Sequence, residues 1–525
     1  MTRATLAKAA GIVAFLTIAS KILGFFRETA LAAVFGAGSN TDAYLIAQTI
    51  PYLLFSTVSY ALSTTFIPVY SQIREEQGTE ASSRFASTVI WAVVIIGVML
   101  VIIGEVFAGL LVRIVAPGFD QSVAQLTAYL SRIILPMMVF QLLSGILTGL
   151  LQADGQFGVP SAASLLQNVS IIISIVVFGV RYGITAVAVG TLVGAILATI
   201  VKIPALKLTE FRWTGAFDRH NPGVKRVGTL VIPAIIGAGV GELNTLVDRI
   251  LASGLPEGSV SALNYANRLM QLAPSIIGTS LITVIYPTLA ELAAKNDRNS
   301  LAKSLADSLG LMHFMLAPIA LGVLVLREPF VRIVFERGEF DAAATQETAW
   351  ALLFLSLGIA IFSMRNLVYR AFFALQDTTT PMVLGVVSVG VNVVLNLLLV
   401  GPLRQGGLAL ATTISGLVGL VAGLFVFGRR SSVRFPVKRL LNTVLKTGLS
   451  SIVMGVIVWA VYQRAQLVLP WRGSFLELVP VGIVVAIGAA VYFLTTWILR
   501  VPELASALDI VKRGVGWLRR KLIGT

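Results

Sequence analysis

Apolar residues in this chain occur in long blocks, and short polar segments separate the blocks. Runs of about 20 apolar residues recur from Ala9 to Leu499, and a helix of roughly that length crosses a bilayer core. The pattern predicts about fourteen transmembrane helices. Their approximate ranges are 8–35, 41–72, 86–115, 124–151, 157–179, 183–206, 225–252, 260–293, 303–335, 342–375, 380–400, 406–428, 442–463 and 476–499. Prolines within these ranges predict kinks, at Pro51, Pro68, Pro136, Pro274, Pro287 and Pro318.

The composition excludes a soluble globular protein. Of 525 residues, 56% are hydrophobic and only 12% are charged. The longest segment outside the apolar runs, around Lys207–Lys225, is too short for a domain. The chain has no cysteine, which excludes disulfides, thiol catalysis and cysteine-based metal sites. It has no Walker A motif, so transport would have to be driven by an ion gradient or by the membrane potential.

The formal net charge of +15 comes from basic residues that gather in alternate loops and in the C-terminal tail. Residues 36–41 and 254–259, by contrast, contain no Lys or Arg. Basic loops stay in the cytoplasm, so we expect both termini to be cytoplasmic and the number of spans to be even. This distribution is not a nucleic-acid signal. The tail, 500–525, predicts an amphipathic helix that lies on anionic lipid.

Two parts of the chain resemble each other at a nearly constant spacing. Landmarks 224 residues apart are Leu151 and Leu375, Asn168 and Asn392, and Gly183 and Gly407. Transporters with parallel repeats hold their substrate between the halves. We therefore expect an all-α polytopic membrane protein with two six-helix lobes around a central cavity and two C-terminal helices. The predicted parts are the N-terminal lobe 1–206, the cytoplasmic basic linker 207–224, the C-terminal lobe 225–428, the basic loop 429–441, the last two helices 442–499 and the amphipathic tail 500–525.

Charged residues interrupt the apolar runs at matching places in the two halves. They are Lys21, Arg27 and Asp42 near the start, and Asp248, Arg249 and Arg268 past the middle. A charge at the bilayer centre costs roughly 2.5–3.5 kcal/mol, so such residues normally face a bundle interior or an aqueous cavity. Since guanidinium groups match phosphate oxygens, we predict an anion site with Arg27 and Arg268 on opposite sides. The alternative is a set of structural salt bridges, in which Arg27 pairs with Glu28, Asp42 or Asp248.

A second group of polar residues is rich in oxygen and nearly neutral. Asn392 and Asn396 are four residues apart and share one helix face. Thr412 lies on the next helix, and Asp248 on the first helix of the second half. Carboxylate, amide and hydroxyl oxygens suit a hard cation such as Na⁺. The alternative is polar packing between helices, which the residues alone favour.

Four stretches resemble the MurJ/MviN lipid II flippase family, within the multidrug/oligosaccharidyl-lipid/polysaccharide exporter superfamily. They are KILGFFRETALAAVFGAGSNTDAYLIAQTIP (21–51), TTFIPVY (64–70), LPEGSVSALNYANRLMQ (255–271) and YRAFFALQDTTTP (369–381). The resemblance covers about residues 8–430. It implies fourteen helices in two six-helix lobes with an inward-open cationic cleft. It also implies a groove for the lipid tail along the last two helices.

The resemblance assigns roles to the charged residues. Arg27 and Arg268 match functional charges of the family and would bind pyrophosphate, with Lys21 assisting where the family usually has arginine. Asp42 also matches a functional charge. Glu28, Asp42 and Asp248 would balance the charge of the cavity or gate it.

The chain departs from the family pattern at two places. Phe55, Ser56 and Tyr60 stand where many members carry arginines and a glutamate, so a charged lateral portal is not implied. Arg249 would supply a replacement cation. Asn396 stands where some members have a carboxylate of a sodium site. The rest of that set is Asp248, Asn392 and Thr412, and the lost charge weakens the case for sodium.

The resemblance implies a transporter rather than an enzyme. Its substrate would be lipid II, the undecaprenyl-pyrophosphate-linked peptidoglycan precursor, moved to the outer leaflet of the bacterial cytoplasmic membrane by alternating access for cell-wall biogenesis. Membrane potential would drive it, with Na⁺ as a candidate coupling ion and no other cofactor. Anionic lipids and cell-wall synthesis proteins are the further expected partners. The alternatives are a flippase for another polyprenyl-linked glycan, a drug/cation antiporter, a membrane-embedded glycosyl- or phosphotransferase, and a non-transporting scaffold.

Overall fold

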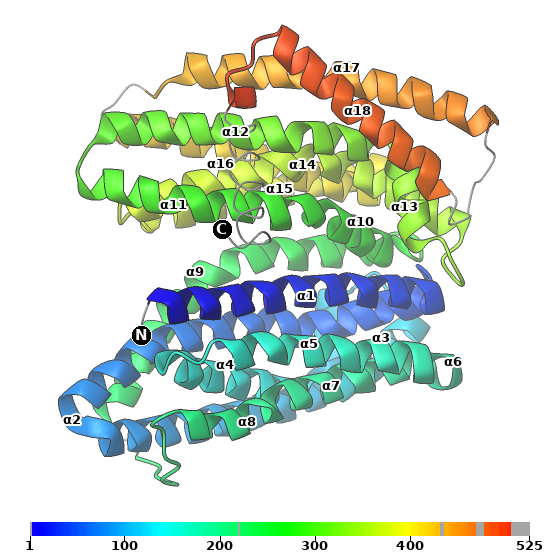
Figure 1. The fold of residues 1–525 in the computed structure, drawn as a ribbon. Coiled ribbons are helices and arrows are strands. Elements are labelled where there is room, and N and C mark those ends of the chain that lie inside the picture. Colours follow the sequence, from blue (N-terminus) through cyan, green and yellow to red (C-terminus); the bar gives the residue numbers. More distant parts are fainter. Residues whose placement is uncertain (1–2, 219–220, 431–434, 469–476, 506–525) are drawn as a thin grey trace. The chain divides into compact units, whose positions relative to one another are not determined.

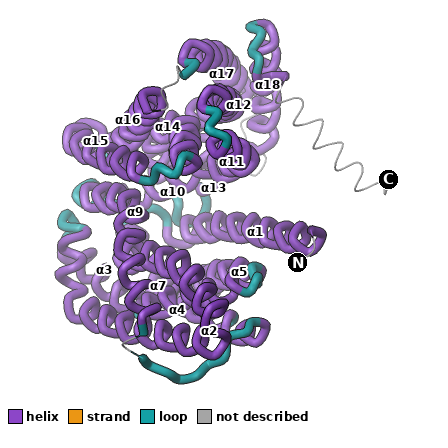
Figure 2. The backbone as a smooth tube through the Cα atoms, turned by 90° about the vertical axis from the view of Figure 1, so that its left-hand side faces the viewer, coloured by secondary structure: helices purple, strands orange, loops and turns teal. Residues whose placement is uncertain are grey.

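The structure is a computed structural model that describes residues 3–218, 221–430, 435–468 and 477–505. The side chains of residues 3–10, 53–56, 60, 233–234, 236–238 and 240–241 lie outside this description. Throughout the described residues the regular elements are helices and no strand occurs (Figure 2), which confirms the all-α prediction. The chain divides into two compact units, residues 1–261 with 337–344, and residues 262–336 with 345–525.

The first unit holds the helices α1 to α9 (Figure 1). Their bounds are α1 Arg3–Phe35, α2 Ser39–Val115, α3 Gln121–Ile134, α4 Met137–Ala153, α5 Gly158–Ile173, α6 Gly179–Tyr182, α7 Ile184–Ile200, α8 Lys202–Ala205 and α9 Pro222–Ala252, with a π turn at Ser174–Phe178 and a 3-10 turn at Leu206–Leu208. Because α9 packs along α2, it belongs to this unit. The lobe boundary at residues 207–224, inferred from the repeat, stays a prediction.

Helix α2 contains two predicted spans in one element. Its 77 residues correspond to about 115 Å of helix, more than twice what a bilayer needs. The polar stretch between the spans is helical because it is rich in good helix formers, and Arg84 pairs with Glu80 at 2.5 Å. The helix leaves helical geometry at Gly78, where φ is +87°. This break permits a return across the membrane.

The second unit holds the remaining helices. Their bounds are α10 Ser259–Ala273, which starts at the boundary of the units, α11 Thr279–Ala294, α12 Arg298–Val325, α13 Arg327–Phe335, α14 Ala342–Ala374, α15 Thr379–Leu403, α16 Gln405–Arg430, α17 Val437–Val468 and α18 Leu478–Ile498, with a π turn at Pro274–Gly278. The prediction of one continuous span over 303–335 is wrong. The helix stops at Leu326, and Pro329 lies in the first turn of α13, where its missing N–H is tolerated.

Eleven of the described helical segments are long and apolar enough to cross a membrane, with α2 taken as one. Helices α1 and α9, with 33 and 31 residues, also have sufficient length. The number fourteen stays a prediction. Of the predicted kink sites, Pro136 separates α3 from α4 and Pro274 starts a π turn. The helices run through the other four prolines without a break.

Aromatic and small side chains pack each unit. In the first unit Phe66 stacks on Tyr70 and on Phe85, with ring centroids 5.4 Å and 5.5 Å apart, and so joins the two halves of α2. In the second unit α17 and α18 pack beside α12 (Figure 1). There the Tyr492 hydroxyl donates to the Phe314 carbonyl at 2.7 Å. The groove for a lipid tail along α17 and α18 stays a prediction.

Candidate functional site

Arg27 lies in a polar cluster formed by α1 and α5. Its Nη2 pairs with Glu28 Oε1 at 2.6 Å, and its Nη1 donates to Asn168 Oδ1 at 3.3 Å. The Asn168 amide in turn donates to the Ser164 carbonyl at 3.0 Å. The Arg27 side chain is 21% exposed, whereas that of Glu28 is 4% exposed. A guanidinium has five N–H donors, so Arg27 keeps donors for a ligand in addition to these two bonds.

A small void adjoins Arg27 and Glu28, with Tyr44 and Gln48 on its wall. Its volume of about 10 Å³ is close to the minimum for one water molecule. A pyrophosphate is far larger, so it can reach the guanidinium only from the exposed side of Arg27.

Two carboxylates bind helix starts reciprocally: Asp42 of α2 accepts at the start of α10, and Glu257, just before α10, accepts at the start of α2. Asp42 is 3% exposed, and its two carboxylate oxygens accept from the backbone N–H groups of Gly258 at 2.9 Å and Ser261 at 2.7 Å, at the start of α10. In return, Glu257 Oε1 accepts from the backbone N–H of Ser39 at the start of α2, at 2.8 Å. Negative charge at a helix N-terminus is favourable, so the two carboxylates stabilise this pair of helix starts.

The bond from Ser39 lowers the pKa of Glu257, because it favours the charged carboxylate. The sign of the linkage follows from that direction. The stabilisation is complete above the ordinary carboxyl pKa, and it is lost as the pH falls through the lowered pKa of Glu257.

Three glycines let the loops at this end of the first unit approach closely. Gly36, Gly258 and Gly338 have φ of +64°, +83° and +59°, a region that favours glycine. A Cβ at any of them would overlap a backbone carbonyl oxygen, that of Glu339, Ala37 or Ala33 respectively. The loops can therefore meet only where side chains are absent.

We expect Asp42→Ala to lower thermal stability. The substitution leaves the N–H groups of Gly258 and Ser261 without an acceptor, at a cost of about 2–4 kcal/mol. Asp42→Asn, which keeps one acceptor oxygen, should retain part of the stability. The melting temperature of the purified protein measures both, and equal melting temperatures for wild type and Asp42→Ala would contradict the cap.

The other predicted charges lie on three helices. Arg249 Nη1 donates to the Leu45 carbonyl of α2 at 2.7 Å, and its neighbour Asp248 is half-buried on α9. Lys21 is exposed on α1, and Arg268 is exposed on α10 in the second unit. Within the first unit the structure thus brings Arg27 and Glu28 together.

The oxygen-rich residues of the second unit form a hydrogen-bonded row. Asn396 Nδ2 donates to Asn392 Oδ1 at 2.9 Å, and Asn392 Nδ2 donates to Thr412 Oγ1 at 3.2 Å. Both asparagines are fully buried. The row joins α15 to α16, as the packing alternative expects, and two of its oxygens, Asn392 Oδ1 and Thr412 Oγ1, accept from N–H donors. The single carboxylate of the predicted sodium set, Asp248, belongs to the first unit, so sodium binding stays a prediction.

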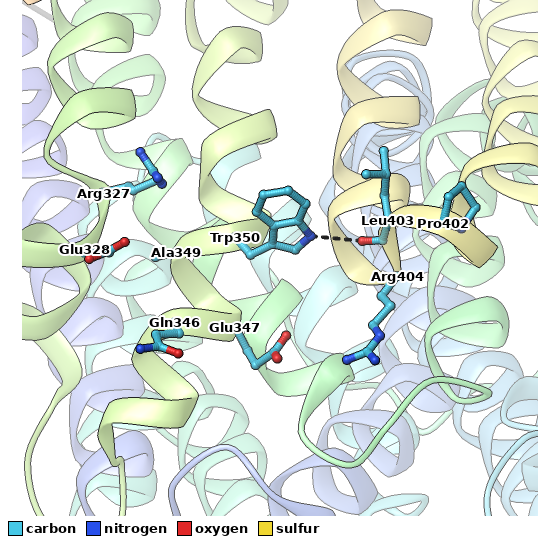
Figure 3. Close-up of a pocket in the computed structure, with 9 residues that line it drawn as sticks. All are labelled: Arg327, Glu328, Gln346, Glu347, Ala349, Trp350, Pro402, Leu403 and Arg404. Atoms are coloured by element: carbon cyan, nitrogen blue, oxygen red, sulfur yellow. Dashed lines mark hydrogen bonds between the residues drawn. The ribbon is translucent and has the colours of Figure 1, made fainter.

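The second unit also has a polar cavity of about 450 Å³ at the starts of α13 and α14 and the end of α15 (Figure 3). Trp350 is held on its wall by a bond of 3.0 Å from Nε1 to the Leu403 carbonyl. Two arginines, Arg327 and Arg404, face two glutamates, Glu328 and Glu347. The charges balance, so this cavity does not favour an anion, and it contains none of the predicted site residues.

Comparison with known proteins decides the family. The family model described as "Lipid II flippase MurJ" matches residues 31–495. The chain belongs to the lipid II flippase MurJ family. A probable lipid II flippase MurJ of Rickettsia prowazekii (strain Madrid E) is 27% identical over 95% of this chain and 98% of its own. That of Rhizobium meliloti (strain 1021) is 31% identical over 77% of each chain.

A solved structure agrees with this membership. The lipid II flippase MurJ in an inward closed conformation has a TM-score of 0.79 and 28% identity, over 93% of this chain and 98% of that one. An inward-facing multidrug resistance MATE family transporter has a TM-score of 0.68 at 15% identity, which shows a shared fold only. MurJ proteins are transporters, so the chain is a multi-pass membrane transporter and not an enzyme.

Three residues that the structure shows to be buried or hydrogen-bonded are not singled out by the sequence pattern. Asn168, the partner of Arg27, was noticed only as a landmark of the repeat. The segment 254–259 reads as a loop without Lys or Arg, whereas Glu257 stands two residues before the start of α10. Lys202, at the end of the predicted span 183–206, is only 5% exposed, although a basic residue at such a place is expected in a solvated loop. The side chains of Phe55, Ser56 and Tyr60 lie outside the described ones, so the predicted departure at the portal stays a prediction.

Proposed function

We propose that this chain moves lipid II from the inner to the outer leaflet of the bacterial cytoplasmic membrane by alternating access. The observation that carries the proposal is the MurJ family match over residues 31–495. The chemistry agrees, because a pyrophosphate cannot cross hydrocarbon unaided and cationic groups offset its desolvation.

We further propose that Arg27 and Arg268 bind the pyrophosphate, with Lys21 and Arg249 assisting. Arg27 supports this role because it combines a partly exposed guanidinium with remaining N–H donors. Its ion pair with Glu28 at 2.6 Å also serves the step in which the empty transporter returns to its starting conformation. Without substrate, Glu28 neutralises the cation, and with substrate the pyrophosphate oxygens compete for the same donors. Asp42 and Asp248 contribute further negative charge.

Membrane potential is the proposed driving force. An inside-negative potential favours outward movement of an anion by about 2.3 kcal/mol per charge per 100 mV. We expect flipping in vesicles to accelerate when such a potential is imposed and to slow when an ionophore removes it. A rate that does not depend on potential would contradict this coupling.

Sodium coupling is a separate proposal that needs Asp248 together with Asn392, Asn396 and Thr412. It predicts faster flipping in Na⁺ than in K⁺, and loss of that difference in Asp248→Asn. Equal rates of the wild type in both salts would leave the asparagine row with a packing role alone.

The proposed topology has both termini in the cytoplasm. The basic tail is proposed to bind anionic lipid, and residues 506–525 lie outside the described ones. Contacts with cell-wall synthesis proteins also stay proposals.

Cells that are depleted of their own lipid II flippase test the function. We expect expression of this chain to restore growth and to return lipid II to the outer leaflet, where an added enzyme can cleave it. Normal membrane levels of the protein without restored cleavage would contradict the proposal.

A further inference from the structure

Lys202 is a buried cation whose described partners are all neutral. It is 5% exposed and lies at the first residue of α8. Its Nζ donates to Ser144 Oγ, to Thr148 Oγ1 at 3.0 Å and to the Ser144 carbonyl at 3.3 Å. Among the described residues, no carboxylate lies within ion-pair distance of it.

This arrangement is costly without a counter-charge. Removing an ammonium from water costs several kcal/mol even after relaxation, and buried charges are normally paired. Two other half-buried cations of this chain have such a partner. Arg332 pairs with Glu477 at 2.8 Å, and Arg27 pairs with Glu28 at 2.6 Å. We therefore expect a bound anion to supply the counter-charge of Lys202.

A cavity of about 330 Å³ adjoins Lys202 between α2, α4 and α8 of the first unit. Its volume is roughly ten times the share of one water molecule in the liquid. Hydroxyl and amide side chains line it, Ser59 and Ser63 from α2 and Gln141, Ser144 and Thr148 from α4. Gly145 also lines the cavity, and the absence of a Cβ there lets α4 approach Ser59 of α2 closely. The ammonium, hydroxyl and amide groups of this lining fit a hydrogen-bonding headgroup.

Gln141 indicates the second chemical property of the occupant. Its side-chain oxygen Oε1 is buried and has no hydrogen-bond partner among the described residues. A buried acceptor without a donor is unfavourable, and a hydroxyl of the ligand would supply the missing donor. The cavity thus offers a cation and hydroxyl groups for an anion, and an acceptor for a hydroxyl.

We propose that this cavity binds a phosphate ester that carries a free hydroxyl, of the phosphoglycerol type. The Lys202 ammonium balances the phosphate charge, Ser and Thr hydroxyls donate to its oxygens, and Gln141 accepts from the glycerol hydroxyl. The same chemistry occurs in the headgroup of phosphatidylglycerol and in soluble glycerol phosphate. Both ligands would enter through the half-exposed walls formed by α2 and α4.

Binding to the full-length protein tests the proposal. Native mass spectrometry of protein from nanodiscs that contain equal phosphatidylglycerol and phosphatidylcholine measures lipid retention, and a thermal shift with added glycerol phosphate measures the soluble ester. We expect selective retention of phosphatidylglycerol. If phosphatidylglycerol is retained but glycerol phosphate causes no thermal shift, the ligand is the lipid. If phosphatidylglycerol is retained and glycerol phosphate also causes a shift, the headgroup alone is sufficient for binding.

Three variants make the result specific to this cavity. Lys202→Met should weaken binding at least tenfold, whereas Lys202→Arg should stay within about threefold of wild type, since one bond to a charged group is worth about 1.5–3 kcal/mol. Lys207→Met removes an exposed lysine five positions away and should change nothing. If Lys202→Met fails to fold, Thr148→Val, with an expected loss of several-fold, replaces it. Equal binding by wild type and the Lys202→Met or Thr148→Val variant, or no binding of either probe by wild type, overturns the proposal.

Discussion

Arg268→Ala and Arg27→Ala are each expected to reduce lipid II flipping at least about tenfold at unchanged membrane levels. A hydrogen bond to a charged group contributes about 1.5–3 kcal/mol, and about 1.4 kcal/mol is a factor of ten. Each substitution removes a guanidinium fork that matches two pyrophosphate oxygens. Flipping by the variants in depleted cells, measured as cleavable lipid II in the outer leaflet, checks the expectation.

The Arg27 variant needs a control for stability. Loss of Arg27 leaves Glu28 buried without this partner, and breaking a buried pair costs roughly 3–5 kcal/mol. The double variant Arg27→Ala/Glu28→Gln removes both charges, so it should recover thermal stability while flipping stays low. Recovery of flipping together with stability would show that Arg27 has a structural role only.

The Arg268 variant has a simpler control. Arg298 is exposed at the start of α12, and Arg298→Ala removes the same charge from the second unit. We expect it to flip at the wild-type rate. Full activity of both variants would remove Arg268 from the binding site.

Gly258→Ala is expected to lower the free energy of unfolding by roughly 2–4 kcal/mol. Its φ of +83° is strained for alanine, at a cost of about 1–3 kcal/mol. The new Cβ also overlaps the Ala37 carbonyl oxygen. Relief of that overlap would move the backbone N–H that donates to Asp42 at 2.9 Å. The change therefore disturbs the helix starts that Asp42 and Glu257 stabilise.

Gly254 offers a matched control in the same loop. A Cβ at Gly254 would meet the Leu251 carbonyl at 3.6 Å, an ordinary contact. Gly254→Ala should melt within a few degrees of wild type, and Gly258→Ala well below it. Similar melting temperatures for the two variants would show that the close approach of the loops does not require glycine.

The helices could be predicted from the sequence because the bilayer fixes their length and character. The predicted range 342–375 differs from α14 by a single residue, and 406–428 lies within α16. The failures occur where a boundary depends on local polar chemistry. The segment 73–85 is polar, so the apolar periodicity ends there, although its glutamates and arginines continue α2. The end of α12 at Val325 was missed because the apolar character continues into α13.

The charged residues could be selected from the sequence, but their partners could not. Arg27 was identified because membrane charges are rare, and of its alternative partners the adjacent Glu28 is the one that it contacts. Asn168 and Asn392, which are 224 residues apart, both bond to a neighbouring helix. The repeat spacing pairs the two positions but does not predict these contacts. Lys202 was overlooked since a basic residue near a span end is normally solvated, and its burial depends on hydroxyls from α4.

Purified protein in vesicles of defined lipid allows lipid II flipping to be measured without other cell components. Fluorescent lipid II is placed in the inner leaflet, and its arrival outside is measured with and without an imposed inside-negative potential. We expect protein-dependent flipping that the potential accelerates and that Arg268→Ala reduces at least about tenfold. Well-folded protein that leaves lipid II in place but flips another polyprenyl-linked glycan would contradict it.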